Sequence, residues 1–85
     1  MGKDVASDLM SLRRAAARHL IAVSDSAEIY SDLGQFIDAA ADMSNETVLL
    51  DAIDLTDQIE SLCDDAHASL VRYARSNAWA ALHDI

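Results

Sequence analysis

Apolar residues recur along the chain at intervals of three and four, which is the spacing of one face of an α-helix. In the N-terminal part this stripe consists of Val5, Leu9, Leu12, Ala16, Leu20 and Val23. The pattern predicts a first helix over residues 4–23. Because the chain contains no proline and only two glycines, we expect local capping residues to decide where each helix ends.

A second apolar stripe predicts a helix over residues 26–42, with Ile29, Leu33, Phe36, Ile37 and Ala40 facing the core. Asp25, with Glu28 three residues later, has the spacing of a capping box, which satisfies free backbone N–H groups at a helix start. Gly34 lies on the flank of this helix. We expect it to cost the helix about 1 kcal/mol relative to alanine.

The third stripe is the longest and runs through Val48, Ala52, Leu55, Ile59, Leu62, Ala66 and Tyr73. After an N-cap at Ser44 or Asn45, it predicts one helix over residues 46–75, at least about 45 Å long at 1.5 Å per residue. Short connections near residues 24 and 44 favour antiparallel neighbours. We therefore expect an all-α fold, an antiparallel three-helix bundle with a long C-terminal helix, in a single domain spanning residues 1–85.

The apolar rhythm fails after Arg75, because Trp79 and Leu82 fall on another side of the long helix. Either the helix breaks near residues 76–77 and a short terminal helix follows, or this end packs on another molecule. Further apolar residues lie off the main stripes, namely Met10, Ile21, Leu49, Leu50, Ile53 and Val71. This excess predicts an apolar seam that serves self-association, most simply as a two-fold dimer.

Charge is distributed unevenly along the chain. The net charge is -9, and residues 19–71 hold twelve acidic residues with neither Lys nor Arg. Like charges also recur four residues apart, a spacing that destabilises a helix slightly. The predicted acidic face, with candidate partner-binding residues, comprises Glu28, Asp32, Asp38, Asp42, Asp54, Asp57, Glu60 and Asp64. Such a face either only maintains solubility or resembles a nucleic-acid backbone to a protein whose groove is basic.

Residues with catalytic or metal-binding chemistry are few. Glu60, Cys63, Asp64 and His67 have spacings that can place two metal ligands together on a helix. Only one copy of this constellation is present and no second helix offers a matching histidine, so we expect no metal and no cofactor. Neighbouring carboxylates raise the pKa of a thiol, which disfavours Cys63 as a nucleophile. The chain also lacks phosphate-loop and nucleophile-elbow motifs, and we do not expect an enzyme.

Arg13, Arg14 and Arg18 form the one basic group. Nucleic acid would repel a chain of this net charge, so we expect no direct nucleic-acid binding and place these arginines against the acidic second or third helix. No apolar run approaches the roughly 18 residues of a membrane span, and no targeting segment is visible. With one cysteine, Cys63, the chain is expected in the cytoplasm, that of a bacterial host if it is phage-encoded.

Two functional hypotheses follow. In the first, the protein is a small non-enzymatic inhibitor or binding protein that blocks a basic, nucleic-acid-binding surface of a larger protein. In size, charge and helical content it is similar to small phage-encoded inhibitors of bacterial defence such as anti-CRISPR proteins, a likeness of general type that carries over no residue. In the second, it is a homo-oligomeric adaptor or antitoxin-like protein that binds through the apolar seam. The apolar candidates for partner binding or oligomerisation are Leu49, Ile53, Val71, Trp79 and Leu82.

Overall fold

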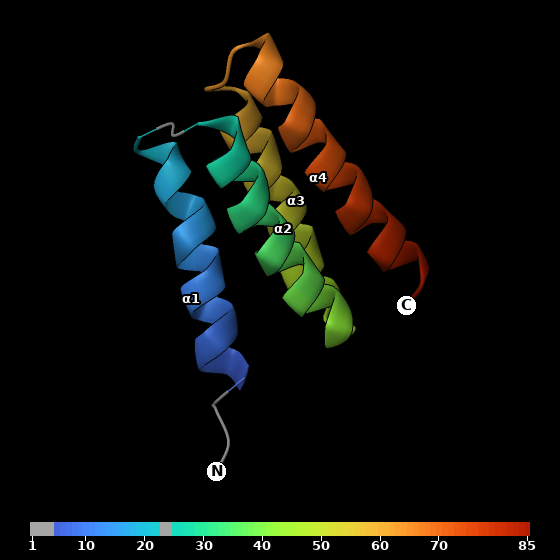
Figure 1. The fold of residues 1–85 in the computed structure, drawn as a ribbon. Helices are drawn as coiled ribbons and strands as arrows, with labels where there is room; N and C mark the ends of the chain where they lie inside the picture. Colours follow the sequence, from blue (N-terminus) through green and yellow to red (C-terminus); the bar gives the residue numbers. More distant parts are fainter. Residues whose placement is uncertain (1–4, 23–24) are drawn as a thin grey trace.

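The computed structural model describes the backbone of residues 5–22 and 25–85 and the side chains of residues 9–22 and 25–85. Over this part of the chain the protein is all-helical (Figure 1). Its elements are α1 (Val5–Ala17), a short 3-10 helix η1 (Arg18–Leu20), α2 (Ser26–Asp42), α3 (Glu46–Glu60) and α4 (Asp65–His83). The predicted all-α class is confirmed. The predicted core residues Val5 and Val23 lie outside the described side chains.

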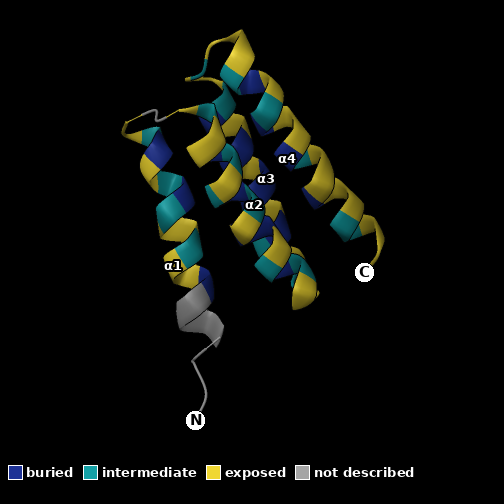
Figure 2. Cartoon of the chain, in the orientation of Figure 1, coloured by how far each residue is buried: buried dark blue, intermediate teal, exposed yellow. Residues whose placement is uncertain are grey.

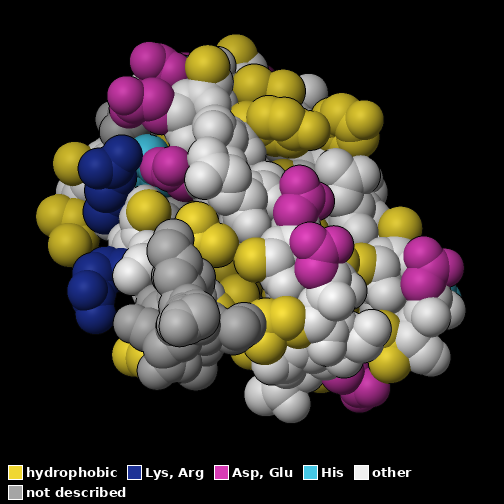
Figure 3. Space-filling model, turned by 60° about the horizontal axis from the view of Figure 1, so that its bottom comes forward, with side chains coloured by type: hydrophobic (Ala, Val, Ile, Leu, Met, Phe, Trp, Pro, Cys, Tyr) yellow, Lys and Arg dark blue, Asp and Glu magenta, His cyan; other side chains and the backbone are white. Residues whose placement is uncertain are grey.

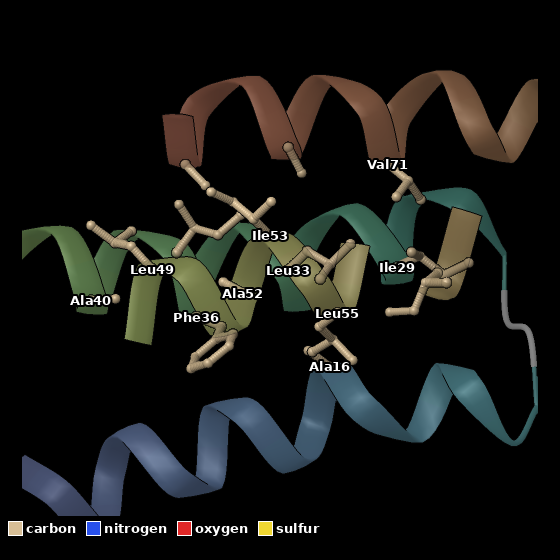
Figure 4. Close-up of a cluster of buried hydrophobic side chains, with 14 of the residues drawn as sticks. Ala16, Ile29, Leu33, Phe36, Ala40, Leu49, Ala52, Ile53, Leu55 and Val71 are labelled. Carbon is tan, nitrogen blue, oxygen red and sulfur yellow. The ribbon is translucent and has the colours of Figure 1, made fainter. Parts of the chain in front are cut away.

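Helix α2 is the centre of the fold. It packs against α1, α3 and α4, and α3 packs against α4. Figure 1 shows α1 and α4 at opposite edges, with α2 and α3 between them. Each helix turns its buried residues toward its neighbours and its exposed residues outward (Figure 2), as an amphipathic helix must when it covers a shared core. Side chains of α2 that are almost fully buried include Ile29, Leu33 and Phe36 (Figure 4).

The predicted single helix over residues 46–75 is wrong, because α3 ends at Glu60 and α4 begins at Asp65. Asp64 caps the new helix by accepting a hydrogen bond from the backbone N–H of His67 at 3.0 Å. As a separate helix, α4 packs against α2 and α3. The apolar rhythm across the break was misleading, since Leu62 is 51% exposed. The described chain therefore has four α-helices where three were predicted.

The end of the first helix and the C-terminal part of the last helix also differ from the prediction. Helix α4 continues without a break through residues 76–77 and ends at His83, so the first of the two alternatives, a break followed by a short terminal helix, is wrong. Its buried side is made largely of small residues, Ala68, Val71, Ala74 and Ala78. Ala68, Ala74 and Ala78 were not recognised as core, because alanine adds little to an apolar pattern. At the other end, α1 stops at Ala17 and tightens into η1 rather than continuing to residue 23.

The predicted caps of the middle helices are present. Asp25 accepts from the backbone N–H of Glu28 at 3.0 Å, and Asn45 accepts from the backbone N–H of Val48 at 3.1 Å. Asn45, not Ser44, is thus the N-cap of α3. Ser44 instead lies in the left-handed region, with φ 50°, and its N–H bonds to the carbonyl of Ala41. This is the geometry that ends α2 and turns the chain within a few residues.

Gly34 offers a simple way to stabilise the fold. A Cβ atom built at this helical position meets nothing within 4 Å, so alanine fits without strain. Because glycine loses more backbone freedom on folding, Gly34→Ala is expected to raise the free energy of unfolding by about 0.5–1 kcal/mol. Urea unfolding followed by circular dichroism measures the change. Ala41→Gly in the same helix should shift the midpoint the opposite way, and an unchanged midpoint for Gly34→Ala would contradict the expectation.

Candidate functional site

Two arginines near the N-terminus bind acids of the middle helices, as predicted. Arg13 donates from Nε to Asp51 of α3 at 2.5 Å, and Arg18 approaches Asp32 of α2 at 3.4 Å. Both arginines are exposed, so each pair is worth less than about 1 kcal/mol. The contacts nevertheless remove Asp51 and Asp32 from the carboxylates that are free to meet a partner. Arg14 is exposed as well.

A second set of ion pairs joins α3 to α4. Arg75 donates from Nη1 to Asp57 and to Glu60, each at 2.5 Å, and Arg72 donates to Glu60 at 3.1 Å. The hydrogen bonds from Arg75 and Arg72 lower the pKa of Glu60 below its usual range. Asp57 and Glu60, both assigned to the acidic face from sequence, therefore serve to hold α4 against α3.

The residues considered as metal ligands have structural partners. Asp64 caps α4, and its carboxylate also lies 2.7 Å from Nδ1 of His67. These bonds, the backbone bond foremost, lower the pKa of Asp64. The pKa of the half-buried Cys63 thiol is raised by burial and by the charges of Asp64 and Glu60. Within the described part of the chain, no three His, Cys, Asp or Glu side chains converge as a metal site would require.

The structure reveals a buried polar contact that sequence reasoning missed. His19 is fully buried, and its Nε2 lies 2.7 Å from Oδ2 of Asp32. Its other ring nitrogen, Nδ1, has no hydrogen-bond partner. The available sequence signal for the burial of His19 was its spacing of three from the core residue Ala16. Nothing local could identify Asp32, thirteen residues away, as the partner of His19. Asp32 is therefore a structural residue.

Apart from the capping residues Asp25, Asp64 and Asp84 and from Asp65 at the start of α4, the acids that remain exposed and bind no arginine of the described chain lie on α2 and α3. Glu28, Asp38 and Asp42 belong to α2, and Glu46 and Asp54 belong to α3. The face seen in Figure 3 shows acidic side chains in separate groups, with apolar and uncharged atoms between them. The predicted acidic face is thus divided: half of its members are tied into the fold, and the other half remain available.

The predicted apolar seam is corrected for three of its members. Leu49 and Val71 are 0% exposed and Ile53 is 7% exposed, so all three belong to the core of one molecule. Figure 4 shows Ile53 between α3 and α4, and Val71 pointing from α4 into the same cluster. Ile53 is covered because α4 is a separate helix that packs on α3, and Val71 lies on the buried side of α4. Leu82 is half-buried. Trp79 is 47% exposed, and so is Leu50, which was also assigned to the apolar seam from sequence.

A hollow of about 270 Å³ lies where α1 meets the end of α2 and the start of α3. It is mainly apolar, with the Arg13–Asp51 ion pair at its border. The residues that line it are Leu9, Met10, Arg13, Phe36, Met43, Asn45, Val48 and Asp51. Such a hollow suits an apolar side chain of a bound molecule.

The described surface presents carboxylates together with exposed apolar side chains. No helix in the described ranges 5–22 and 25–85 is long and apolar enough to cross a lipid bilayer. Comparison with protein-family models, with curated proteins and with solved structures finds no match to this chain.

Proposed function

We propose that the protein is a small, non-enzymatic acidic binding protein that covers a basic, nucleic-acid-binding surface of a larger protein in the cytoplasm, as an anti-CRISPR-like inhibitor does. One observation supports the proposal most. Arg13, Arg18, Arg72 and Arg75 are all engaged by other acids, while carboxylates on the outer side of α2 remain exposed and uncompensated within the described chain. Such a surface steers and holds a basic partner.

The structure narrows the residues proposed to contact the partner. Of the acids assigned from sequence, Asp32, Asp57, Glu60 and Asp64 are held by an arginine, a histidine or a helix cap, whereas Asp54 accepts only an exposed hydrogen bond from Gln58 of its own helix at 2.9 Å. Replacing any of the first four would disturb a cap or an ion pair, and a loss of binding could not be separated from a loss of structure. The contact set is therefore Glu28, Asp38 and Asp42 of α2, with Asp54 of α3.

The test is capture of a partner by the immobilised protein, followed by competition. A protein retained from host lysate should be released by a double-stranded oligonucleotide and by raising NaCl from about 50 to 500 mM, because salt screens exposed charge pairs. The Asp38→Asn/Asp42→Asn variant should retain it at least about tenfold more weakly, since each carboxylate removed takes away a charge-assisted contact.

The control is Asp65→Asn/Asp84→Asn, which changes the net charge equally at two exposed acids near the ends of α4. This variant should retain the partner like the parent protein. The proposal is wrong if neither high salt nor the oligonucleotide releases the partner and the Asp38→Asn/Asp42→Asn variant retains it like the parent protein.

A second candidate function is a homo-oligomeric adaptor or antitoxin-like protein that binds through apolar surface. The apolar hollow favours it, because Met10 and Met43 at its border are both largely exposed. Binding of this kind would persist in high salt and fall in a Met10→Ser/Met43→Ser variant. Light scattering over a concentration series measures self-association directly, and a constant monomer mass would remove the homo-oligomeric form.

We also infer the finer architecture predicted from sequence, namely that consecutive helices run antiparallel. Only residues 43–45 separate α2 from α3, and residues 61–64 separate α3 from α4. Connections this short favour antiparallel neighbours. Distances measured between spin labels test the inference. In an antiparallel pair the start of α3 lies closer to the end of α4 than to its start.

A further inference from the structure

Leu50 of α3 and Trp79 of α4 lie along one edge of the molecule. Arg72 pairs with Glu60 of α3, and Arg75, about one turn further along α4, pairs both with Glu60 and with Asp57, about one turn further back along α3. One more helical turn in each direction brings Trp79 beside Ile53 of α3, and Leu50 lies about one turn before Ile53. Ile53 fills the space between the two helices there (Figure 4). Leu50 and Trp79 therefore flank the buried Ile53 as an apolar patch.

Carboxylates frame this patch. Residues 46, 50 and 54 are spaced by four and thus lie in one row along α3, and all three are exposed. Leu50 consequently has Glu46 one turn before it and Asp54 one turn after it. On the α4 side, Arg75 lies one turn before Trp79, but its charge is balanced by Asp57 and Glu60.

The charges around the patch favour one kind of bound molecule over another. A second copy of this chain, bound symmetrically through the same edge, would bring two sets of carboxylates together, which is unfavourable. A segment with apolar residues on one face and Lys or Arg beside them would satisfy both the apolar patch and its acidic border. An amphipathic helix presents side chains in that way, with anchors three and four residues apart.

We propose that the edge of α3 and α4 around Leu50 and Trp79 is a docking site for a basic amphipathic helix of the protein partner. The proposal rests on the basic partner inferred above and adds the form in which it is recognised. Trp79 acts as the aromatic anchor, since aromatic side chains at the centre of an interface carry much of its binding energy.

Trp79 is the only tryptophan in the chain, so its fluorescence reports on the site directly. The probe is a tryptophan-free synthetic helical peptide of Leu and Lys with Leu at i, i+3, i+4 and i+7. Adding increasing amounts of this peptide should shift the Trp79 fluorescence emission until the change saturates. A peptide of the same composition in scrambled order, and one with Glu in place of Lys, should bind at least about tenfold more weakly.

The matched variants are Leu50→Ser and Leu62→Ser, which remove one exposed leucine from α3 and one from the connection between α3 and α4. Leu50→Ser should weaken peptide binding at least about fivefold, and Leu62→Ser should leave it unchanged. Equal effects of the two variants, no response of Trp79, or emission that depends on protein concentration without peptide would each overturn the docking site. If the docking site fails these tests but capture of the partner still depends on Asp38 and Asp42, the proposed function stands without the docking site.

Discussion

Leu49→Ala is expected to lower the free energy of unfolding by about 2–5 kcal/mol, the largest effect of any change considered for this protein. Leu49 is 0% exposed and belongs to the cluster of buried side chains that α4 covers. Truncation removes apolar surface from the core and leaves a cavity that close-packed neighbours fill only in part. A domain of this length has a total stability of only about 4–13 kcal/mol, so the variant should be close to unfolding.

The adjacent residue provides a control of the same chemistry. Leu50 is 47% exposed, and Leu50→Ala should change the free energy of unfolding by less than about 1 kcal/mol. Urea unfolding of both variants, followed by circular dichroism, measures the difference. If Leu49→Ala proved as mild as Leu50→Ala and instead weakened self-association, the assignment of Leu49 to an exposed seam would be right and its place in the core wrong.

Asp32→Ala is expected to lower the free energy of unfolding by about 1–3 kcal/mol. The reason lies in His19, whose Nδ1 already has no hydrogen-bond partner while Nε2 lies against Asp32. Removal of Asp32 leaves a fully buried imidazole with no partner at either nitrogen. The accompanying loss of the Arg18 contact adds little, because the Arg18 side chain is 62% exposed.

A double-mutant cycle separates this cost from other effects of the substitution. In a His19→Leu background the buried polar group is absent, so Asp32→Ala should cost at least about 1 kcal/mol less than it does in the parent protein. Asp38→Ala, at an exposed position of the same helix, should stay within about 0.5 kcal/mol of the parent. Equal costs of Asp32→Ala in both backgrounds would show that His19 does not depend on Asp32.

The two expectations bear on function as well as on stability. If Asp32 holds η1 to α2, its carboxylate is not available to a partner, although its position in the acidic segment suggested that it was. If Leu49 is in the core, the apolar surface available for binding shrinks to side chains such as Leu50 and Trp79. The surface that binds is then smaller than the sequence implied.

Helix α2 shows what local sequence could determine. Its predicted range of 26–42 is the observed one, because Asp25 forms its capping bond within three residues and the left-handed turn at Ser44 directly follows its end. The N-cap Asn45 acts over the same short range. Interactions of this kind depend on neighbours in the chain and are readable from a single sequence.

The break between α3 and α4 shows where that reasoning stopped. Asp64 and His67 were considered as metal ligands, and a metal site was not favoured, but the capping role of Asp64 was missed. An aspartate that precedes a helix has the same spacing to the residue whose N–H it caps. The apolar rhythm continued across residues 61–64 and favoured one helix. Burial of Val71, Ala74 and Ala78 against the rest of the fold decided otherwise, and that burial depends on residues far away in the chain.

The sequence by itself determined the all-helical class, the starts of α2 and α3 and the acidic, base-free middle of the chain, since these depend on composition and on neighbours within four residues. The tertiary structure decided which acids are paired and which apolar residues are covered. Arg13 meets Asp51 across 38 residues, and Arg75 meets Asp57 across 18. Contacts over such separations form only when whole helices pack, so the division of the acidic segment into structural and available carboxylates could not be predicted from the sequence.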